Sequence, residues 1–345
     1  MLKEIKKRIE EEQKNFIRDI DKLYGLSRLS SLLFKSISEF LLRPGKKIRP
    51  ILFIIGYLGF AKRKAPGLYR TALAIELLHA FLLVHDDIID KSPLRRGKPS
   101  MHKLLDHYLK NHKDIKFNGQ DLAIVAADVI YAMAIQAFMA IQEDASRKEE
   151  ALKKFIEATI FTESGEFIEL LYSIKKLNQL SKEDAYRIYD LKTAYYTFIC
   201  PLATGAVLAG ASQKEVDKLS QYAIFLGRAF QIKDDISGMF SEEEKTGKSS
   251  LTDLQETKKT ILIWYAYNNA TTRQRKSMEK IFSKKQVSRT DLLLMRDIIR
   301  ATGSLSFAQS EISKLIQKAQ SLQNSSKMKI GYKKALSSYT QTLFL

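Results

Sequence analysis

Three carboxylates stand close together in the segment HDDIID, at Asp86, Asp87 and Asp90. Residues three and four apart share one face of a helix, so these side chains would lie together near the C-terminal end of a helix. Like charges at this spacing, and the negative end of the helix dipole, make the cluster unfavourable unless positive charge compensates it. The compensation could come from Arg95 and Arg96, or from divalent cations such as Mg²⁺, which bind carboxylate oxygens and are often completed by substrate phosphates. A solvated acidic helix end is the plain alternative.

A second pair of acids, Asp234 and Asp235, ends another apolar stretch, LGRAFQIKDDISGMF. Two apolar helices that end in acid pairs indicate two facing walls of one metal-filled cavity. Arg and Lys, the usual protein ligands of phosphate, occur in loops near both acid segments. Carboxylates for metal and cations for phosphate together predict a site for a diphosphate ester. The basic loop residues, besides the two arginines, are Lys46, Lys47, Arg49, Lys248, Lys258 and Lys259.

Long helices must position these groups, because the chain of 345 residues has only 15 glycines and 6 prolines and is rich in Leu, Ile, Ala, Lys and Glu. The polar breaks, such as RPGKK and KSPLRRGKPS, are short, and no repeat of fixed period occurs. We therefore predict one all-α domain over residues 1–345, with periodicity lost only over the last twenty or so residues. Helices are expected near residues 2–22, 28–42, 48–61, 67–91, 121–142, 147–173, 181–198, 214–236, 257–270, 288–301 and 303–322.

Features that bear on location favour the cytoplasm. The single cysteine, Cys200, cannot form an internal disulfide, and the charged N-terminal segment lacks the apolar stretch of a signal peptide. Residues 123–141 are nearly long enough to cross a bilayer, but Asp128, Gln136 and several alanines favour a buried core helix. No transmembrane segment is therefore expected.

The charge balance is strongly basic, with 57 Lys and Arg against 39 Asp and Glu, a net charge of +18. Such a surplus suits nucleic acid, anionic lipid or a phosphorylated substrate. The basic clusters are scattered, lack interleaved aromatic residues and match no nucleic-acid-binding motif. We therefore favour surface decoration, and expect no nucleic-acid partner and at most weak association with membrane surfaces.

The order of the motifs resembles the trans-isoprenyl diphosphate synthases, the family of farnesyl, geranylgeranyl and polyprenyl diphosphate synthases. The motifs are GKKIRP, ELLHAFLLVHDDIIDKSPLRRGKPSMH, GEFIEL, LKTAYY, GRAFQIKDDISGMF and TGKSSLTDLQETKKT, from about residue 40 to residue 264. The resemblance implies an all-α bundle of antiparallel helices around a deep central cavity, usually in a homodimer. It also implies a Mg²⁺-assisted reaction, in which an allylic diphosphate ionises and isopentenyl diphosphate attacks the resulting cation.

The same resemblance implies roles for individual residues. Asp86, Asp90 and Asp234 would ligate Mg²⁺, and the acid motifs as a whole, with Asp87, Asp235 and Lys192, would serve catalysis. The binders of isopentenyl diphosphate would be Lys46, Arg49, His79 and Arg96. The binders of the allylic substrate would be Arg95, Lys192, Thr193, Gln231, Lys248 and Lys258.

Product length rests on Phe81, five positions before Asp86. In the family, a bulky residue there often forms the floor that stops chain growth, and the small Leu82 favours a twenty-carbon product, geranylgeranyl diphosphate, over fifteen carbons. A helix wheel, however, places Leu82 and Leu83 nearer the carboxylate face than Phe81. A farnesyl or longer-chain synthase stays open, as does a weakly active regulatory subunit, because Gly238 stands where many members have a third aspartate.

Overall fold

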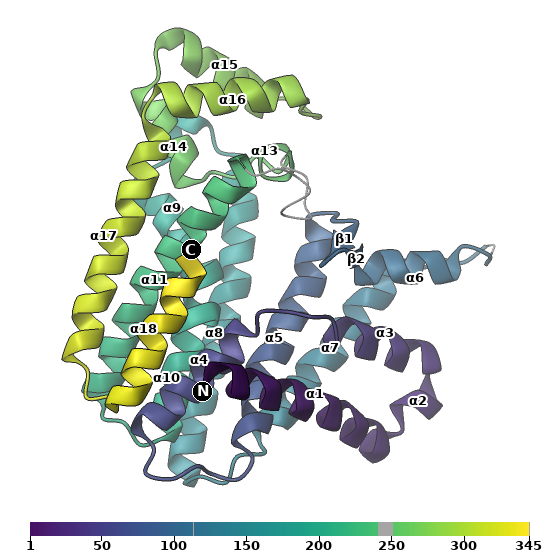
Figure 1. Ribbon diagram of the computed structural model, residues 1–345. Helices are drawn as coiled ribbons and strands as arrows, with labels where there is room; N and C mark the ends of the chain where they lie inside the picture. The colour runs from purple at the N-terminus through teal and green to yellow at the C-terminus, as the bar shows by residue number, and fades with distance from the viewer. Residues whose placement is uncertain (113, 241–250, 345) are drawn as a thin grey trace. The chain divides into compact units, whose positions relative to one another are not determined.

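The computed structural model describes residues 1–112, 114–240 and 251–344 (Figure 1). Helices make up nearly all of the regular structure in these residues, so the predicted all-α class is confirmed. By its internal contacts the chain divides into two compact units. Unit 1 comprises Met1–Phe155 and Pro201–Ala211, and unit 2 comprises Ile156–Cys200 and Ser212–Leu345.

Unit 1 is built around α5 (Leu68–Ile89), which packs against α1, α4 and α7. Residues 71–78 of α5 are all buried. Consecutive residues point all around a helix, so a stretch that is buried throughout requires neighbours on every side. The other elements of the unit are α1 (Leu2–Tyr24), α2 (Leu26–Leu29), α3 (Ser31–Leu41), α4 (Ile48–Phe60), β1 (Leu94–Arg95), β2 (Lys98–Pro99), α6 (Met101–Leu109), α7 (Gly119–Phe138), the first part of α8 (Ala145–Ser173) and nearly all of α10 (Cys200–Leu208).

Two glycines bring α4 and α10 together within unit 1. A Cβ on Gly56 would lie 2.6 Å from the carbonyl oxygen of Leu202, and a Cβ on Gly205 would lie 2.5 Å from that of Phe53. Such distances leave no space for a side chain, so glycine at both positions permits the close approach of the two helices. This contact helps to seat α4, whose N-terminal end carries the GKKIRP segment.

The helix α7 is the apolar segment for which a buried core helix was expected. Within the described residues it is the one helix long and apolar enough to cross a membrane, and 44% of its apolar window is buried. One side packs against α5 and α6, while Ile124 and Val125 on the other side are exposed. The prediction of a buried core helix therefore holds only for the side of α7 that packs against α5 and α6.

Unit 2 is centred on α11 (Gln213–Phe240), which packs against η2, a π-helix over Asp190–Ile199, and against α17 and α18 (Figure 1). Its core gathers apolar side chains such as Leu262, Met295 and Ile299. The remaining elements are the later part of α8, η1 (Leu177–Gln179), α9 (Lys182–Tyr189), α13 (Thr252–Gln255), α14 (Ile261–Asn269), α15 (Thr272–Phe282), α16 (Arg289–Ala301), α17 (Ser304–Ser325) and α18 (Ile330–Phe344).

Several elements differ from the sequence-based expectation. The helices α6, α15 and α18 were not predicted, and α18 occupies the terminal segment that was expected to lose periodicity. The segment that leads into α18 is held by a residue far away in the sequence, since buried Glu215 accepts hydrogen bonds from the Ser326 hydroxyl at 2.8 Å and the Lys327 amide at 2.7 Å. The loop KSPLRRGKPS contains the hairpin β1–β2, and the π-helix replaces the second half of the helix expected over 181–198.

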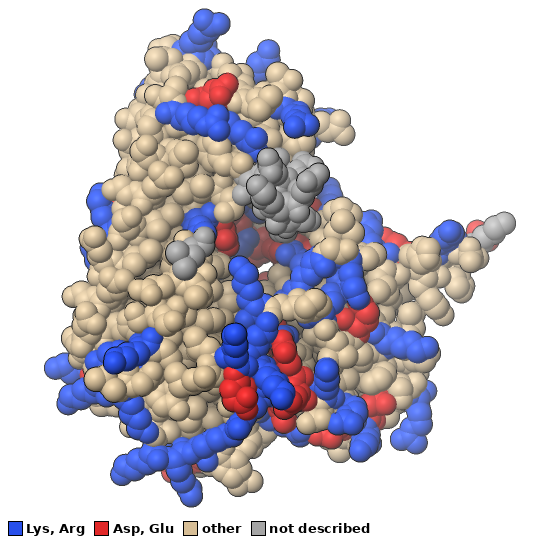
Figure 2. Space-filling view, viewed as in Figure 1, with Lys and Arg blue, Asp and Glu red and all other residues tan. Residues whose placement is uncertain are grey.

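Basic side chains are distributed over the surface. On the face shown in Figure 2, Lys and Arg lie at many separate places and most densely in the lower centre, where Asp and Glu lie among them, whereas much of the left side carries few charges. This distribution agrees with surface decoration on that face.

Candidate active site

The three acids of the first motif do not share one environment at the end of α5. Asp87 is 0% exposed, whereas the Asp86 side chain is 29% exposed and Asp90, the C-cap residue, is partly exposed. Asp86 and Asp90 are joined by the backbone hydrogen bond from the Asp90 amide to the Asp86 carbonyl, at 2.9 Å. The outer two carboxylates can therefore reach a ligand, while Asp87 points into the protein.

Arg95 compensates part of this negative charge. Its Nε and one terminal nitrogen donate to Oδ1 of Asp87 at 2.8 and 2.5 Å, and the same terminal nitrogen contacts Oδ2 of Asp86 at 3.0 Å. Burial by itself would lower the pKa of Arg95, but the hydrogen bond and charge of Asp87, and then the charge of Asp86, raise it instead. Arg95 therefore compensates Asp87 through its Oδ1 oxygen and Asp86 through a single contact.

A cavity of about 310 Å³ lies beside the N-terminal end of α4, a size within the range of small-molecule sites. The loop before α4, one turn of α5 and the β1–β2 turn form its wall. All four residues predicted to bind isopentenyl diphosphate line it: Lys46, Arg49, His79 and Arg96. The structure thus brings together side chains that are up to 50 positions apart in the sequence.

Lys47 belongs to the same loop but plays a different part. Its backbone is left-handed at φ 53°, and its buried ammonium group donates to Gln13 at 2.8 Å and to Glu76 at 2.9 Å. This ion pair neutralises Glu76, a carboxylate that also lines the cavity, and ties the loop to α1 and α5. Lys47 therefore lines the cavity as Lys46 and Arg49 do, but its charge is already engaged by Glu76.

His79 lies among cations in this cavity. Burial, followed by the positive charges of Arg49, Arg96 and Arg95, holds the pKa of His79 well below its ordinary value. The imidazole is consequently neutral at neutral pH and offers hydrogen bonding without charge.

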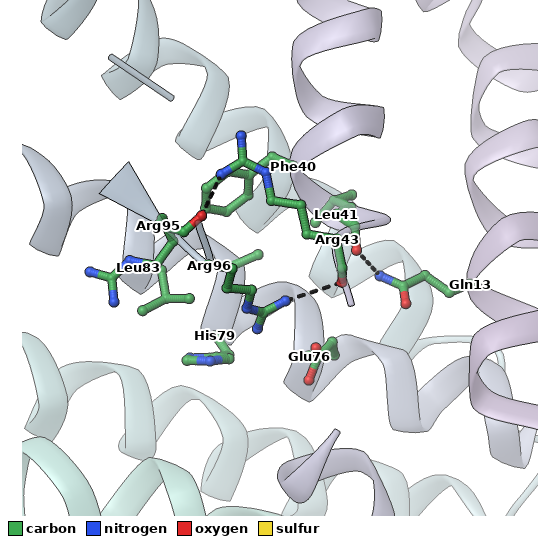
Figure 3. Close-up of a pocket in the computed structure, with 10 residues that line it drawn as sticks. Gln13, Phe40, Leu41, Arg43, Glu76, His79, Leu83, Arg95 and Arg96 are labelled. Atoms are coloured by element: carbon green, nitrogen blue, oxygen red, sulfur yellow. Dashed lines mark hydrogen bonds between the residues drawn. The ribbon is translucent and has the colours of Figure 1, made fainter. Parts of the chain in front are cut away.

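A second, adjoining pocket lies under the hairpin. Figure 3 shows His79, Glu76, Arg95 and Arg96 around it, with Leu83 beside them. The helix-wheel expectation that Leu83 lies toward the polar face of α5 agrees with this placement. The other lining residues are Gln13, Phe40, Leu41, Arg43 and Ala80.

The second acid motif lies on α11 in unit 2, and again its two acids differ. Asp234 is exposed, whereas Asp235 is buried and accepts hydrogen bonds from the Tyr189 hydroxyl and from Nε2 of Gln231, the latter at 3.0 Å. The Tyr189 oxygen in turn accepts the amide hydrogen of Ile261 at 2.9 Å. Burial, and then the charge and hydrogen bond of Asp235, raise the pKa of Tyr189 well above its ordinary value, which keeps the phenol protonated as a donor.

The π-helix η2 carries Lys192 and Thr193. The Thr193 hydroxyl donates to Oε1 of Gln231 at 2.5 Å, and so continues the network that ends at Asp235. Gly165 of the GEFIEL segment permits α8 to approach η2 closely, since a Cβ on Gly165 would lie 2.7 Å from Cβ of Leu191. π-Helical turns are rare and often occur at functional sites.

Two glutamates of the same segment hold Lys192. Its ammonium group pairs with Glu166 at 2.5 Å and also with Glu169. Lys192 therefore carries its own counter-charges within unit 2, which the sequence-based assignment of a diphosphate binder did not foresee.

The lysines after the second acid motif have different fates. Lys248 lies outside the described residues. Lys258 is paired with Glu256 at 2.8 Å. Lys259, grouped from the sequence with the basic loop residues, is only 5% exposed and packs over the ring of Phe282 at 4.4 Å, and burial lowers its pKa to about 8.

The predicted chain-length residues lie on neighbouring sides of α5. The Phe81 ring is partly buried, 5.0 Å from the ring of Tyr131 on α7 and 4.6 Å from that of His85. Leu82 is buried in the core of the unit. Phe81 thus makes aromatic contacts with α7, which brings Tyr131 into the candidate floor.

Backbone strain concentrates near the predicted site residues. The described residues with positive φ other than glycine are five, and four of them adjoin a site residue or are one. They are Lys47, Lys91, Arg96 and Thr257, while the fifth, Asp114, lies elsewhere.

Sequence reasoning missed several supporting residues, among them the two glutamates that hold Lys192. Glu76 could have been found, because it lies one turn before His79 on the same face of α5. Gln13, Arg43 and Tyr189 give no local signal, because each acts through partners far away in the sequence.

Comparison with known proteins decides the family. The family model described as polyprenyl synthetase matches residues 30–298, well over half of the chain. The chain belongs to this family. It is therefore a prenyl-transferring enzyme by descent, and the predicted family and enzyme class are confirmed.

Individual relatives agree with this assignment. The chain is 29% identical over 298 residues to a short chain isoprenyl diphosphate synthase of Methanocaldococcus jannaschii, covering 86% of this chain and 82% of that protein. It is 32% identical over 260 residues to the geranylgeranyl diphosphate synthase of Saccharolobus solfataricus, covering 74% and 73%. Its fold is similar to that of a geranylgeranyl pyrophosphate synthase of Corynebacterium glutamicum, crystallised with isoprenyl diphosphate and magnesium, with a TM-score of 0.89 over 99% of both chains at 24% identity.

Proposed function

We propose that this prenyltransferase joins isopentenyl diphosphate to an allylic diphosphate, with loss of the allylic diphosphate group and one proton, and releases geranylgeranyl diphosphate. One observation carries the proposal: Lys46, Arg49, His79 and Arg96 line a single cavity, although they come from three separate segments of unit 1. Three fixed cations and one neutral imidazole around a cavity suit a polyanion with several acceptor oxygens.

The homoallylic substrate would be held by its diphosphate in this cavity. Lys46 supplies a compact charge, and Arg49 and Arg96 supply planar groups that can donate two hydrogen bonds to one phosphate. Neutral His79 adds a directional hydrogen bond. Because Lys47 already neutralises Glu76, the only carboxylate among the lining residues does not repel the substrate.

The outer acids of both motifs suit Mg²⁺. Asp86, Asp90 and Asp234 offer hard carboxylate oxygens and are at least partly exposed, whereas Asp87 and Asp235 are buried in contacts of their own units. Within the described residues no three acid, histidine or cysteine side chains form a closed metal site, and Mg²⁺ commonly completes its shell with water and phosphate oxygens. Bound there, Mg²⁺ would withdraw charge from the allylic diphosphate and favour its departure.

The residues of unit 2 would prepare the allylic side. Tyr189 and Gln231 hold Asp235, and this network fixes the end of α11 that carries Asp234. Glu166 and Glu169 hold Lys192 on η2, where its ammonium group would donate to the leaving diphosphate. Within unit 1, Asp86 and Asp87 hold Arg95, which the family resemblance assigns to the allylic substrate.

A twenty-carbon product is supported by two facts. A relative that is 32% identical over 260 residues is named geranylgeranyl diphosphate synthase. Phe81, five positions before Asp86 on α5, contacts Tyr131, so that two bulky rings lie together near the first acid motif.

We also propose a homodimer. Ile124, Val125 and Met139, on and just after α7, are exposed apolar side chains that a second copy would cover. Light scattering coupled to size exclusion tests this, and a monomeric mass at micromolar concentration would contradict it. A cytoplasmic location stays a prediction.

The direct test supplies the purified protein with isopentenyl diphosphate, farnesyl diphosphate and Mg²⁺, and separates the dephosphorylated products by chromatography. We expect the twenty-carbon alcohol as the main product and none when the metal is chelated. If isopentenyl diphosphate is not consumed with any allylic diphosphate of five, ten or fifteen carbons, the chain is not a catalytic subunit by itself.

A further inference from the structure

Arg43, which no sequence motif singles out, lies buried between α3 and the β1–β2 hairpin. Its exposed fraction is 3%, and its guanidinium carbon lies 5.0 Å from the centre of the Phe40 ring. Its Nε and one terminal nitrogen bind Glu39, four residues earlier, at 3.1 and 2.7 Å. The terminal nitrogens also donate to the carbonyl of Arg95 at 3.2 Å and to that of Pro99 at 2.8 Å.

The hairpin that receives these bonds cannot be stable by itself. Its strands, Leu94–Arg95 and Lys98–Pro99, are two residues each, and an isolated hairpin of any length is at best marginal in water. Its turn places Arg96 at φ 56° and Gly97 at φ 73°, the two left-handed positions of a type I′ turn. A left-handed conformation costs an arginine about 1 kcal/mol. Contacts from outside the hairpin must therefore hold it.

Arg43 supplies those contacts on both strands. One terminal nitrogen binds the β1 carbonyl and the other binds the β2 carbonyl, so a single planar group spans the hairpin. The main-chain carbonyl of Arg43 accepts a further hydrogen bond from the Arg96 side chain at 3.3 Å (Figure 3). Gly45, two residues after Arg43, leaves space for the Arg96 guanidinium, since a Cβ on Gly45 would lie 3.0 Å from one of the Arg96 nitrogens.

We propose that Arg43 is a positioning residue, which latches the hairpin to the loop before α4 so that Arg96 points into the cavity that Lys46 and Arg49 line. It lines no part of that cavity and touches no substrate there. The identity of the anion rests on the proposed function, whereas the latch itself rests only on the contacts of Arg43.

The chemistry requires arginine rather than any cation. The bonds to Glu39 and to the two carbonyls use nitrogens at three corners of the guanidinium plane. A lysine has one nitrogen and cannot span the two strands while it also holds the carboxylate. Arg43→Lys therefore keeps the charge and removes the span.

Hydrogen exchange tests the latch without any activity. We expect the amides of residues 94–98 and 100 to exchange at least about tenfold faster in Arg43→Lys, since hydrogen bonds from a charged donor to both strands are lost. Arg147→Lys is the matched control, because Arg147 also binds a glutamate four residues earlier, Glu143 at 2.8 Å, and a carbonyl, that of Leu208 at 2.9 Å. It should leave residues 94–100 unchanged. Unaltered exchange of the hairpin in folded Arg43→Lys overturns the proposal.

Kinetics then test the consequence for binding. Arg43→Lys should raise the Michaelis constant for isopentenyl diphosphate about tenfold and change kcat less than threefold, as a displaced Arg96 predicts. The allylic Michaelis constant should change less, because Arg95 keeps its own bonds to Asp86 and Asp87. In an Arg96→Ala background, Arg43→Lys should add less than about threefold, since both changes remove the same interaction.

Full additivity with Arg96→Ala, or an equal loss for both substrates, would show that Arg43 does not act through Arg96. Should Arg43→Lys fail to fold, Glu39→Gln gives the second variant, because it weakens the hold on Arg43 but leaves both carbonyl bonds possible. Glu39 also pairs with Lys98 of the hairpin at 3.1 Å, so Lys98→Met, which removes that pair alone, is the control. The hairpin amides should exchange faster in Glu39→Gln than in Lys98→Met or wild type, and exchange no faster than in Lys98→Met would again overturn the proposal. If wild type transfers no prenyl group, the proposed function fails while the exchange result still decides the latch.

Discussion

Substitution by asparagine should lower stability more at Asp87 and turnover more at its neighbour Asp86. Asp87 is fully buried and accepts two hydrogen bonds from Arg95, whose side chain is only 12% exposed. Removal of one partner from a buried ion pair typically costs 3–5 kcal/mol, because the remaining charge loses its compensation. Asparagine keeps one acceptor oxygen and Arg95 keeps Asp86, so we expect Asp87→Asn to lower the free energy of unfolding by about 3 kcal/mol.

Asp86→Asn should lower the free energy of unfolding by less than about 1 kcal/mol, because this side chain is partly exposed and makes one contact with Arg95, at 3.0 Å. Turnover should follow the reverse order, with the larger loss in Asp86→Asn, since Asp86 is the proposed metal ligand. Urea unfolding followed by far-UV circular dichroism measures the helices of both units, and the fluorescence of Trp264, the single tryptophan, reports on unit 2 alone. The reasoning is refuted if both variants unfold at the same urea concentration with the same slope.

Four further substitutions test other parts of the account. Arg49→Ala should raise the Michaelis constant for isopentenyl diphosphate at least about tenfold and Lys192→Ala that for the allylic substrate, and equal effects on both substrates would reduce these residues to a general field. Phe81→Ala should shift the product alcohols beyond twenty carbons on chromatography, and an unchanged distribution would show that this ring is not the floor. Lys259→Met should raise the free energy of unfolding at pH 7 by about 2 kcal/mol after allowance for solvent screening, because the folded state pays to bury the charge. The gain should shrink as pH rises from about 8 toward 10.5, where the folded state loses this proton before the unfolded state does, and a gain independent of pH would contradict the burial argument.

The sequence was informative wherever the signal is local. Helical spacing located most long helices, and the charge pattern of HDDIID singled out α5 as the carrier of an acid cluster. The four residues assigned by resemblance to isopentenyl diphosphate do line one cavity. Local patterns and motif order thus carry the class of fold and the content of this cavity.

What the sequence could not predict depends on contacts between distant segments. Arg95 was a candidate counter-charge for the first acid motif, but no spacing rule shows that it holds Asp87 most closely or that Tyr189 holds Asp235. Lys259 reads as a surface lysine beside Lys258, yet packing against Phe282 buries it. The hairpin was read as a loop because its strands are two residues long and are held by a distant arginine.

The central claim is that the outer acids of both motifs serve one metal-dependent prenyl transfer. Incorporation of radiolabelled isopentenyl diphosphate by wild type and by Asp234→Ala, each at saturating Mg²⁺ and farnesyl diphosphate, tests it most directly. We expect wild type to incorporate the label and Asp234→Ala, folded as judged by circular dichroism, to lose at least about a hundredfold in turnover, since loss of groups that merely orient metal ligands already costs up to about that much. Turnover of the variant within a few-fold of wild type would contradict the account.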